Sequence, residues 1–324
     1  MKTFINPKKN DWPEILKRPV FDVSALFGVV QPVLNEIRQT GDAALQKYTL
    51  KFDGVDLVDF RVSENEINEA ENLVDYELKS AIALAAANIV KFHSSQLSPL
   101  KKVETMPGVT CWQKSVPIEK VGLYIPGGTA PLFSTVLMLA IPAQIAGCSE
   151  IVMCSPPDQL GKINPAILYA AKISGISNIY KLGGVQAIGA MAYGTQTVPK
   201  TWKIFGPGNQ YVVAAKQLVS IADAAIDMPA GPSEVLVLAD ETANPAFVAS
   251  DLLSQAEHGA DSQVVLVTGL AETANKVLEE IKIQLEKLPR KPTAAKALEN
   301  SVSIVLEKTG DQIDLINEYA PEHP

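Results

Sequence analysis

A predicted helix near the C-terminal end of the chain carries one of only three histidines in the sequence. Residues 246–258 have helical character, with Asn244 as a plausible N-cap before a proline. On such a helix Asp251, Gln255 and His258 occupy positions i, i+4 and i+7 and share one face. An imidazole and an amide oxygen one turn apart could both bind a cation such as zinc, with further ligands from elsewhere. Alternatively, the imidazole only complements the dipole of the helix end.

A second histidine stands in the dipeptide Glu322-His323, just after a short helical stretch at residues 311–319. A carboxylate beside an imidazole provides two acid–base groups of different proton affinity. One could take a proton from a substrate hydroxyl while the other activates water. The alternative is two solvated side chains on a fraying terminus. The third histidine, His93, ends a long predicted helix, where we expect a capping or packing role.

The elements that would position these groups alternate between strands and helices. The N-terminal third is predicted to be mostly helical, at residues 33–48 and 66–92. From residue 121 onward, short apolar runs alternate with amphipathic helices, which indicates βαβ units and mostly parallel sheets. The predicted strands are residues 121–125, 150–154, 178–182, 202–205, 234–238, 263–267 and 302–306. Seven strands suggest two sheets, so we expect two α/β domains.

Glycine-rich loops follow three of these strands, at residues 126–128, 183–184 and 206–209. A further loop, at residues 227–233, precedes the strand predicted at 234–238. In open parallel sheets, ligands bind beyond the carboxyl ends of the strands, and glycines there let a ligand approach the backbone. Each loop taken alone is more readily explained as an ordinary tight turn, whereas three such loops on one sheet edge favour a nucleotide or another phosphate-bearing ligand. Neither the GxGxxG nor the GxxxxGKS phosphate-binding pattern is present, so these loops leave the cofactor undecided.

The composition excludes several classes of protein. The chain has 28 Lys and Arg against 36 Asp and Glu, a net charge of −8, which argues against a nucleic-acid partner. The N-terminal residues lack the apolar core of a secretory signal. The longest apolar stretch is shorter than a membrane span of about 20 residues. Three cysteines are too few for a disulfide framework. We therefore expect a cytoplasmic globular enzyme without a membrane partner.

Several long segments, taken together and in order, resemble histidinol dehydrogenases from about residue 21 to residue 323. These segments are IRQTGDAALQKYTLKFDGV, VGLYIPGGTAPLFSTVLMLAIPAQIAGC, KLGGVQAIGAMAYGT, KIFGPGN, IDMPAGPSEVLVLAD, DLLSQAEHGADSQVVLV and EYAPEH.

The resemblance implies a zinc-dependent enzyme that oxidises L-histidinol through histidinaldehyde to L-histidine with two molecules of NAD. It implies two incomplete Rossmann-like domains and a homodimer with intertwined terminal pieces. The domains expected in this chain are an N-terminal extension (1–20), a discontinuous catalytic and zinc-binding domain (21–123 with 233–324) and an NAD-binding domain (124–232).

The matching motifs also imply roles for individual residues. The residues implied to contact NAD are Tyr124, Gln186 and Asn209. Those implied to contact the substrate are Ser233, Gln255, His258 and His323. Gln255 and His258 would also be zinc ligands, and Glu322 and His323 would be the catalytic pair. His323 would take the proton of the alcohol, Glu322 would activate water, and zinc would hold the nitrogens of the substrate.

Members of the family continue past the motif that ends in His323, and the part that follows supplies two further zinc ligands and an acidic substrate contact. For residues 1–324 as an isolated polypeptide we therefore expect weak zinc binding and negligible oxidation of histidinol.

Three other functions remain as alternatives. The first is a non-catalytic remnant that binds NAD. The second is a metal-dependent hydrolase built on His258 and Glu322, although the sequence has no HExxH motif. The third is a transferase of phosphate or sugar nucleotides that uses the glycine loops alone, which would leave both histidine segments without a role.

Overall fold

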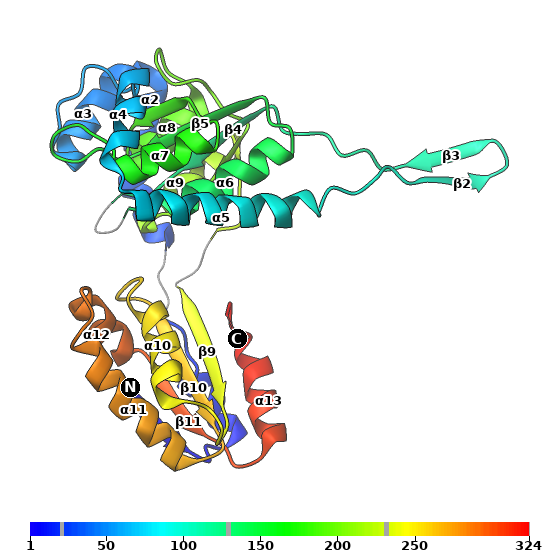
Figure 1. Ribbon diagram of the computed structural model, residues 1–324, viewed down its shortest axis with the longest axis vertical. Coiled ribbons are helices and arrows are strands. Elements are labelled where there is room, and N and C mark those ends of the chain that lie inside the picture. The colour runs from blue at the N-terminus through cyan, green and yellow to red at the C-terminus, as the bar shows by residue number, and fades with distance from the viewer. Residues whose placement is uncertain (20–22, 128–130, 230–232, 324) are drawn as a thin grey trace. The chain divides into compact units, whose positions relative to one another are not determined.

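The computed structural model describes residues 1–19, 23–127, 131–229 and 233–323, and these residues form two compact units (Figure 1). We call Asp22–Pro229 the central unit. The terminal unit combines Met1–Phe21 with Ala230–Pro324. Each unit is built around its own parallel sheet.

The central unit contains a five-stranded parallel sheet in the order β6-β5-β4-β7-β8. Its strands are β4 (Lys120–Tyr124), β5 (Glu150–Ser155), β6 (Asn178–Lys181), β7 (Lys203–Phe205) and β8 (Ala225–Ile226). Most residues of β4 and β5 are buried. Strands covered on both faces have apolar side chains in continuous runs, which is why they stand out in the sequence.

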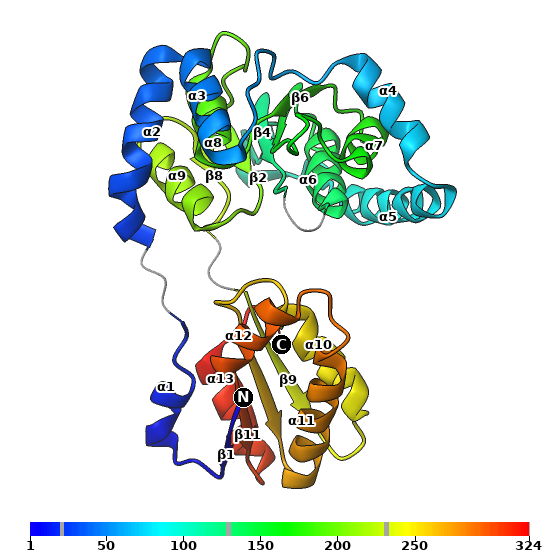
Figure 2. The ribbon, with the colours of Figure 1, turned by 90° about the vertical axis from the view of Figure 1, so that its left-hand side faces the viewer.

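Helices cover both faces of this sheet (Figure 2). On one face lie η2 (Val23–Leu26), α2 (Phe27–Thr40), α3 (Asp42–Asp53), α8 (Gly184–Tyr193) and α9 (Gln210–Ser220). On the other face lie α4 (Glu64–Leu73), α5 (Tyr76–Ser94), α6 (Phe133–Ile145) and α7 (Pro165–Ile173). The helical region predicted at residues 33–48 is divided at Gly41, which has a positive φ of 56°.

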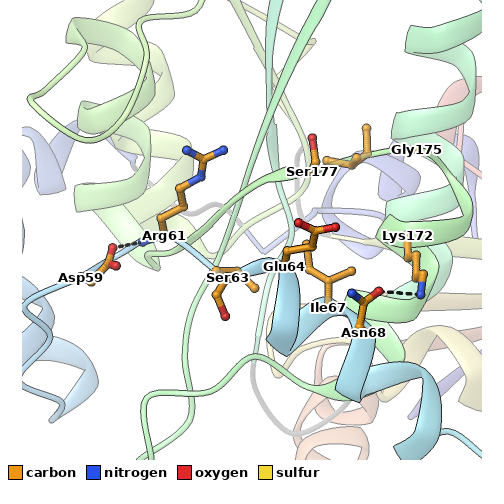
Figure 3. Close-up of a pocket in the computed structure, with 11 residues that line it drawn as sticks. Asp59, Arg61, Ser63, Glu64, Ile67, Asn68, Lys172, Gly175 and Ser177 are labelled. Atoms are coloured by element: carbon orange, nitrogen blue, oxygen red, sulfur yellow. Dashed lines mark hydrogen bonds between the residues drawn. The ribbon is translucent and has the colours of Figure 1, made fainter.

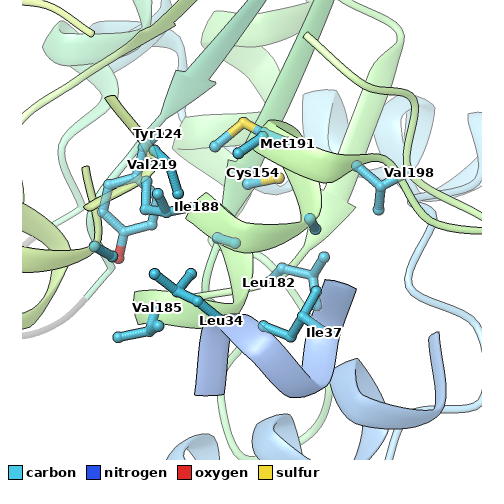
Figure 4. Close-up of a cluster of buried hydrophobic side chains, with 14 of the residues drawn as sticks. Leu34, Ile37, Tyr124, Cys154, Leu182, Val185, Ile188, Met191, Val198 and Val219 are labelled. Atoms are coloured by element: carbon cyan, nitrogen blue, oxygen red, sulfur yellow. The ribbon is translucent and has the colours of Figure 1, made fainter. Parts of the chain in front are cut away.

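The N-terminal helices belong to this unit, which corrects the expected domain boundaries. Leu34 and Ile37 of α2 share a core with Leu182 and Ile188 (Figure 4). Residues 22–123 therefore pack with 124–229, whereas the sequence suggested that 21–123 join 233–324. The sequence did not indicate this because the amphipathic pattern of a helix does not identify the sheet that it covers.

A hairpin in the central unit was not predicted. Strands β2 (Lys102–Met106) and β3 (Val109–Trp112) pair antiparallel. Every residue of both strands is exposed. Neither strand packs one face against a core, so the alternation of apolar and polar residues that marks a half-buried strand in a sequence is not required of them.

The terminal unit contains a four-stranded parallel sheet in the order β1-β11-β10-β9. Its strands are β1 (Lys2–Ile5), β9 (Glu234–Ala239), β10 (Gln263–Thr268) and β11 (Val302–Val305). Alternate side chains of β10 enter opposite cores: Val264 and Leu266 enter one, and Val265 and Val267 enter the other. All six residues of this strand are buried.

One face of this sheet carries α10 (Pro245–Ala256), α11 (Ala271–Leu285) and α12 (Lys291–Glu299), and the other carries α13 (Thr309–Tyr319) (Figure 1) and α1 (Trp12–Ile15), which is labelled in Figure 2. The 3₁₀ turn η1 (Lys9–Asp11) precedes α1. Residues 1–19 are part of this unit rather than an extension, because β1 pairs with β11 and Trp12 is fully buried in the core.

The predicted α/β class with mostly parallel sheets and flanking helices is confirmed. All seven predicted strands are present, each with ends within one residue of those expected. The strands β1 and β8, like the hairpin, were not predicted. Both are short strands at the edge of their sheets, with only four and two residues.

Candidate functional site

The carboxyl ends of β4 and β7 form the switch point of the central sheet. From β4 the chain proceeds outward through β5 and β6 on one side and returns to β7 and β8 on the other. Ligands of open parallel sheets bind at such a point. Tyr124 is the last residue of β4, and residues 206–209 follow β7 directly. The glycine loop expected at 126–128 lies partly outside the described residues.

Tyr124 connects the end of β4 to the start of α8. Its side chain is 4% exposed, and its hydroxyl accepts a hydrogen bond from the backbone N–H of Gly184 at 3.0 Å. Burial raises the pKa of this phenol to about 12, although the bond from Gly184 opposes the shift. Tyr124 therefore remains protonated and orients the glycine loop at the start of α8.

Gln186 lies in the first turn of α8 and is 1% exposed. Its Nε2 donates to Oδ2 of Asp53 at 2.8 Å. Its Oε1 is buried and has no hydrogen-bond partner among the described residues. An unpaired buried oxygen costs about 1–3 kcal/mol, so this atom is suited to accept a hydrogen bond from a ligand. Burial raises the pKa of Asp53, and the bond from Gln186 partly offsets this.

Asp53, the last residue of α3, was not identified as a site residue from the sequence. It is 133 positions away from Gln186 in the chain. No local pattern connects two residues at that separation.

Asn209 begins α9 as its N-cap. Its Oδ1 accepts hydrogen bonds from the backbone N–H groups of Tyr211 at 3.0 Å and Val212 at 3.1 Å. The side-chain oxygen is therefore engaged within the helix, which leaves the Nδ2 group available to a ligand. The positive end of the helix dipole lies at the same place.

A partly buried ion pair fixes the loop before Asn209. Lys216, on α9, is 5% exposed, and its Nζ donates to the carbonyl of Gly206 at 2.8 Å and pairs with Asp227. The other carboxylate oxygen of Asp227 accepts the N–H of Gly206 at 2.8 Å. Gly206 has a φ of 126°, and a Cβ there would lie 2.1 Å from the carbonyl oxygen of Tyr124. The loop thus requires glycine, and Lys216 and Asp227 hold it at both backbone groups.

In the terminal unit, Glu322 and His323 lie beside the edge strand β9. His323 forms a parallel bridge with Val235, and its carbonyl accepts the N–H of Leu236 at 2.9 Å. The N–H of Glu322 donates to Oε1 of Glu234 at 3.2 Å. These backbone bonds hold the dipeptide in place, unlike a fraying end. The side chains are 57% and 60% exposed, with 3.9 Å between Oε1 of Glu322 and Nε2 of His323.

The helix that was predicted to include His258 is shorter than expected. The expected N-cap is present, since Asn244 Oδ1 accepts from the N–H of Ala246 at 3.0 Å. However, α10 ends at Ala256, so His258 lies in the following turn and the shared helix face does not extend to it. Gln255 is on the helix and is buried, whereas the side chain of His258 is exposed.

The predicted residues of the terminal unit gather at the amino ends of its strands. Ser233 directly precedes β9, and its carbonyl accepts the N–H of Gln263, the first residue of β10, at 3.1 Å. Glu322 and His323 align with the first residues of β9. The C-terminal end of α10, with Gln255, leads into β10 at this same edge. The predicted site residues therefore lie at the carboxyl ends of strands in the central sheet but at the amino ends of strands in the terminal sheet, where the rule for parallel sheets would not place them.

The donor set for a metal ion is incomplete in the part of the chain that the structure describes. No group of three or more His, Cys, Asp or Glu side chains there could hold a metal ion. Gln255 and His258 would provide at most two ligands, whereas zinc sites usually have four. These residues alone do not fit a tight zinc site.

A cavity of about 640 Å³ opens elsewhere on the central unit, between α4 and α7 (Figure 3). Its walls include Asp59, Arg61, Asn68 and Lys172, and none of the predicted site residues lines it. Lys172 is already paired with Asn68 and Glu71. The cavity is therefore separate from the switch-point site.

Across the described ranges, no helix is both long and apolar enough to cross a membrane.

Comparisons with known proteins agree with the resemblance in the sequence. The family model described as histidinol dehydrogenase matches residues 16–324. The chain is 61% identical over 323 residues to the histidinol dehydrogenase of Bacteroides thetaiotaomicron, which covers 100% of this chain and 76% of that protein. It is 51% identical over 313 residues to that of Escherichia coli K12, which covers 96% and 71%.

A solved structure matches as well. The crystal structure of histidinol dehydrogenase from Elizabethkingia anophelis has a TM-score of 0.96 and 56% sequence identity, and the match covers 100% of this chain and 75% of that one. Both the family model and these relatives match nearly all of the 324 residues. The chain belongs to the histidinol dehydrogenase family.

Proposed function

We propose that the protein carries out the last step of histidine biosynthesis, the four-electron oxidation of L-histidinol to L-histidine through histidinaldehyde with NAD. The observation that supports this most directly is the dipeptide Glu322-His323. It is held by backbone bonds beside β9, while its acid–base side chains remain exposed. The relatives that match most of the chain carry the name of this activity.

The central unit would bind NAD, through Tyr124, Gln186 and Asn209. The unpaired Oε1 of Gln186 fits a hydroxyl or amide N–H of the cofactor, and the start of α9 fits a phosphate. When bound, NAD supplies the hydride acceptor for both oxidation steps.

The terminal unit would provide the proton transfers. His323, as a neutral imidazole, takes the hydroxyl proton of L-histidinol while the C–H bond of the same carbon breaks, which gives the aldehyde. Glu322 then removes a proton from water, and the resulting hydroxide adds to the aldehyde. His323 returns its proton to the alkoxide formed by this addition, which gives the hydrate and restores the neutral imidazole. It then takes a hydroxyl proton of the hydrate during the second oxidation, which yields the carboxylic acid. Ser233, Gln255 and His258 would contact the substrate.

Zinc would be bound in part by Gln255 and His258, with the remaining ligands from outside these residues. For residues 1–324 alone we propose weak zinc binding that depends on His258 and no sustained turnover. We further propose that the protein works in the cytoplasm as a homodimer.

The test is the formation of NADH from L-histidinol by the protein as its cell makes it. His323→Gln should lower kcat by about a hundredfold or more, the usual contribution of a general base, with little change in NAD affinity. His93→Gln is the matched control, because the imidazole of His93 bonds to Gln96 and packs edge-on against Phe92, so this variant should leave kcat unchanged. Equal loss in both variants, or none in either, would contradict the proposal.

The second candidate is an NAD-binding protein without catalysis. It is favoured by one observation, namely that the three predicted NAD residues all lie in the central unit, which has a complete core of its own. NAD binding without NADH formation by the protein as its cell makes it would select this candidate.

A further inference from the structure

Arg18 makes an unusual set of contacts at the amino end of β9. Its Nε and Nη2 bind the two carboxylate oxygens of Glu234 at 2.5 and 2.8 Å. The same Nη2 also donates to the carbonyls of Tyr319 at 2.5 Å and Ala320 at 3.1 Å. The guanidinium carbon lies 4.4 Å from the centre of the Tyr319 ring. One side chain thus connects β9 to the end of α13.

Glu234 continues the network to the predicted catalytic pair. Its Oε1 accepts the backbone N–H of Glu322 at 3.2 Å, and its side chain is only 12% exposed. The Tyr319 hydroxyl lies 2.9 Å from Oε1 of Gln263 and 3.3 Å from Oε2 of Glu234. Burial alone would raise the pKa of Glu234, but the bonds and charge of Arg18 hold it below its ordinary value.

The backbone between Tyr319 and Glu322 needs such support. Ala320 has the left-handed conformation, with φ 45° and ψ 66°, which costs a residue with a Cβ about 1–2 kcal/mol. This turn reverses the chain after α13 so that His323 pairs with Val235. Arg18 binds the carbonyl of Ala320 and that of the residue before it, so its contacts stabilise the strained turn directly.

We propose that Arg18 and Glu234 are positioning residues that hold Glu322 and His323 against β9. Arg18 fixes the turn at Ala320, and Glu234 fixes the N–H that follows it. The functional consequence rests on the proposed catalytic role of the pair, but the positioning itself does not. Arg18 remains 41% exposed, which limits what the ion pair contributes to overall stability, so we expect the effect to be local to the chain segment 319–323.

The local readouts are two. The N–H of Leu236 binds the carbonyl of His323, so its hydrogen exchange reports whether the segment is docked. The chain has three histidines, so NMR of the imidazoles can resolve His323 from His93 and His258.

The variants are Arg18→Gln and Glu234→Gln, and the matched control is Arg38→Gln. Arg38 pairs with Asp223 and stacks at 4.3 Å over the ring of Tyr193, so it repeats the chemistry of Arg18 in the central unit. Arg18→Gln and Glu234→Gln should each speed exchange at Leu236 by about tenfold and shift the His323 resonances toward those of an unstructured chain. Arg38→Gln should change neither.

Arg18→Lys keeps the charge but cannot bind the carboxylate and two carbonyls in the same planar geometry, so it should give an intermediate exchange rate. Arg18 and Glu234 act through one network, so their effects should not add. Hydrogen exchange at Leu236 in the double variant should be about as fast as in the faster of the two single variants. Unchanged exchange at Leu236 and unchanged His323 resonances in well-folded Arg18→Gln and Glu234→Gln would overturn the proposal. If Arg18→Gln does not fold, Arg18→Lys and Glu234→Gln provide the same comparison.

Kinetics of the protein as its cell makes it separate this inference from the proposed function. With positioning and catalysis both correct, Arg18→Gln lowers kcat while NAD affinity is unchanged, since the predicted NAD residues belong to the central unit. Faster exchange at Leu236 with unchanged kcat would support the positioning and contradict the catalytic role of Glu322 and His323.

Discussion

The side chains of Gln186 and Asp53 are joined by one hydrogen bond, from Nε2 to Oδ2 at 2.8 Å, and this bond determines which end of the amide is free. A carboxylate can only accept hydrogen bonds, so the NH₂ group must face Asp53 and Oε1 must face away. Since Oε1 is buried without a partner in the described chain, the site presents an acceptor. A ligand bound there must contribute an N–H or O–H group.

Gln186→Met should weaken NAD binding by about tenfold, because it removes one hydrogen bond of about 1 kcal/mol and leaves the volume nearly unchanged. The free energy of unfolding should change little, since an unpaired oxygen is lost together with the bond to Asp53. Calorimetric titration with NAD and urea unfolding measure the two effects. Equal NAD affinity in the variant and the parent would exclude Gln186 from the cofactor site.

Asp53→Asn should stabilise the protein in a pH-dependent manner. Burial raises the pKa of Asp53 above its ordinary value of 3.8, so the folded state binds more protons than the unfolded state in the interval between the two. Stability contributed by this group is therefore lost as the pH rises through that interval. Asparagine does not ionise and escapes this loss.

The difference in urea midpoint between Asp53→Asn and the parent should be small below the ordinary pKa and larger at about pH 7. Asp56→Asn is the control, because Asp56 is exposed and its carboxylate accepts a hydrogen bond from Nε2 of Gln46. A difference that shrinks as the pH rises would contradict the assigned direction of the shift.

The sequence was most informative where burial leaves a continuous pattern. Strand β10 is buried along its whole length, and its run of valines and leucine was recognised within one residue. Strand β1 has mostly exposed residues and pairs with β11, about 300 positions away in the sequence, so nothing near it marks it as a strand. The predicted domain boundary was wrong for a related reason, because the sequence of α2 does not indicate which sheet the helix covers.

The site divides in the same way. Motifs predicted site roles for Gln186 and His323, whereas their hydrogen-bonded neighbours Asp53 and Arg18 were not predicted. Asp53 and Arg18 act on partners 133 and 216 positions away, and such pairings exist only after folding. The amino-edge location of His323 was also unexpected, because the rule for parallel sheets points to the opposite edge.

Gly206→Ala should disrupt the loop at the switch point. The added Cβ would lie 2.1 Å from the carbonyl oxygen of Tyr124, and the φ of 126° is strained for any other residue. We expect a loss of stability of about 3 kcal/mol or more and a much weaker affinity for NAD. Gly108→Ala is the control, since its φ is also positive at 79° but no atom lies within 4 Å. Similar losses in both variants would show that only the backbone conformation matters.

Lys216→Met should lower the stability of the protein by more than the loss of an exposed ion pair does. The side chain is nearly buried, and its removal leaves the carbonyl of Gly206 and one oxygen of Asp227 without their donor. Breaking a buried pair from one side costs about 3–5 kcal/mol, and the 29% exposure of Asp227 places this case at the lower end. Lys47→Met, which breaks the more exposed pair with Glu36, should cost less than about 1 kcal/mol.

The same ion pair also predicts a specific effect on ligand binding. Without Lys216, Gly206 loses one of its two backbone anchors, so Asn209 and the start of α9 should no longer be held for a ligand. NAD affinity should fall in Lys216→Met and remain unchanged in Lys47→Met, as measured by titration of folded protein. If Lys216→Met is destabilised yet binds NAD with the parent affinity, the pair supports the fold alone. The loop geometry would then be set by the contact between Gly206 and Tyr124.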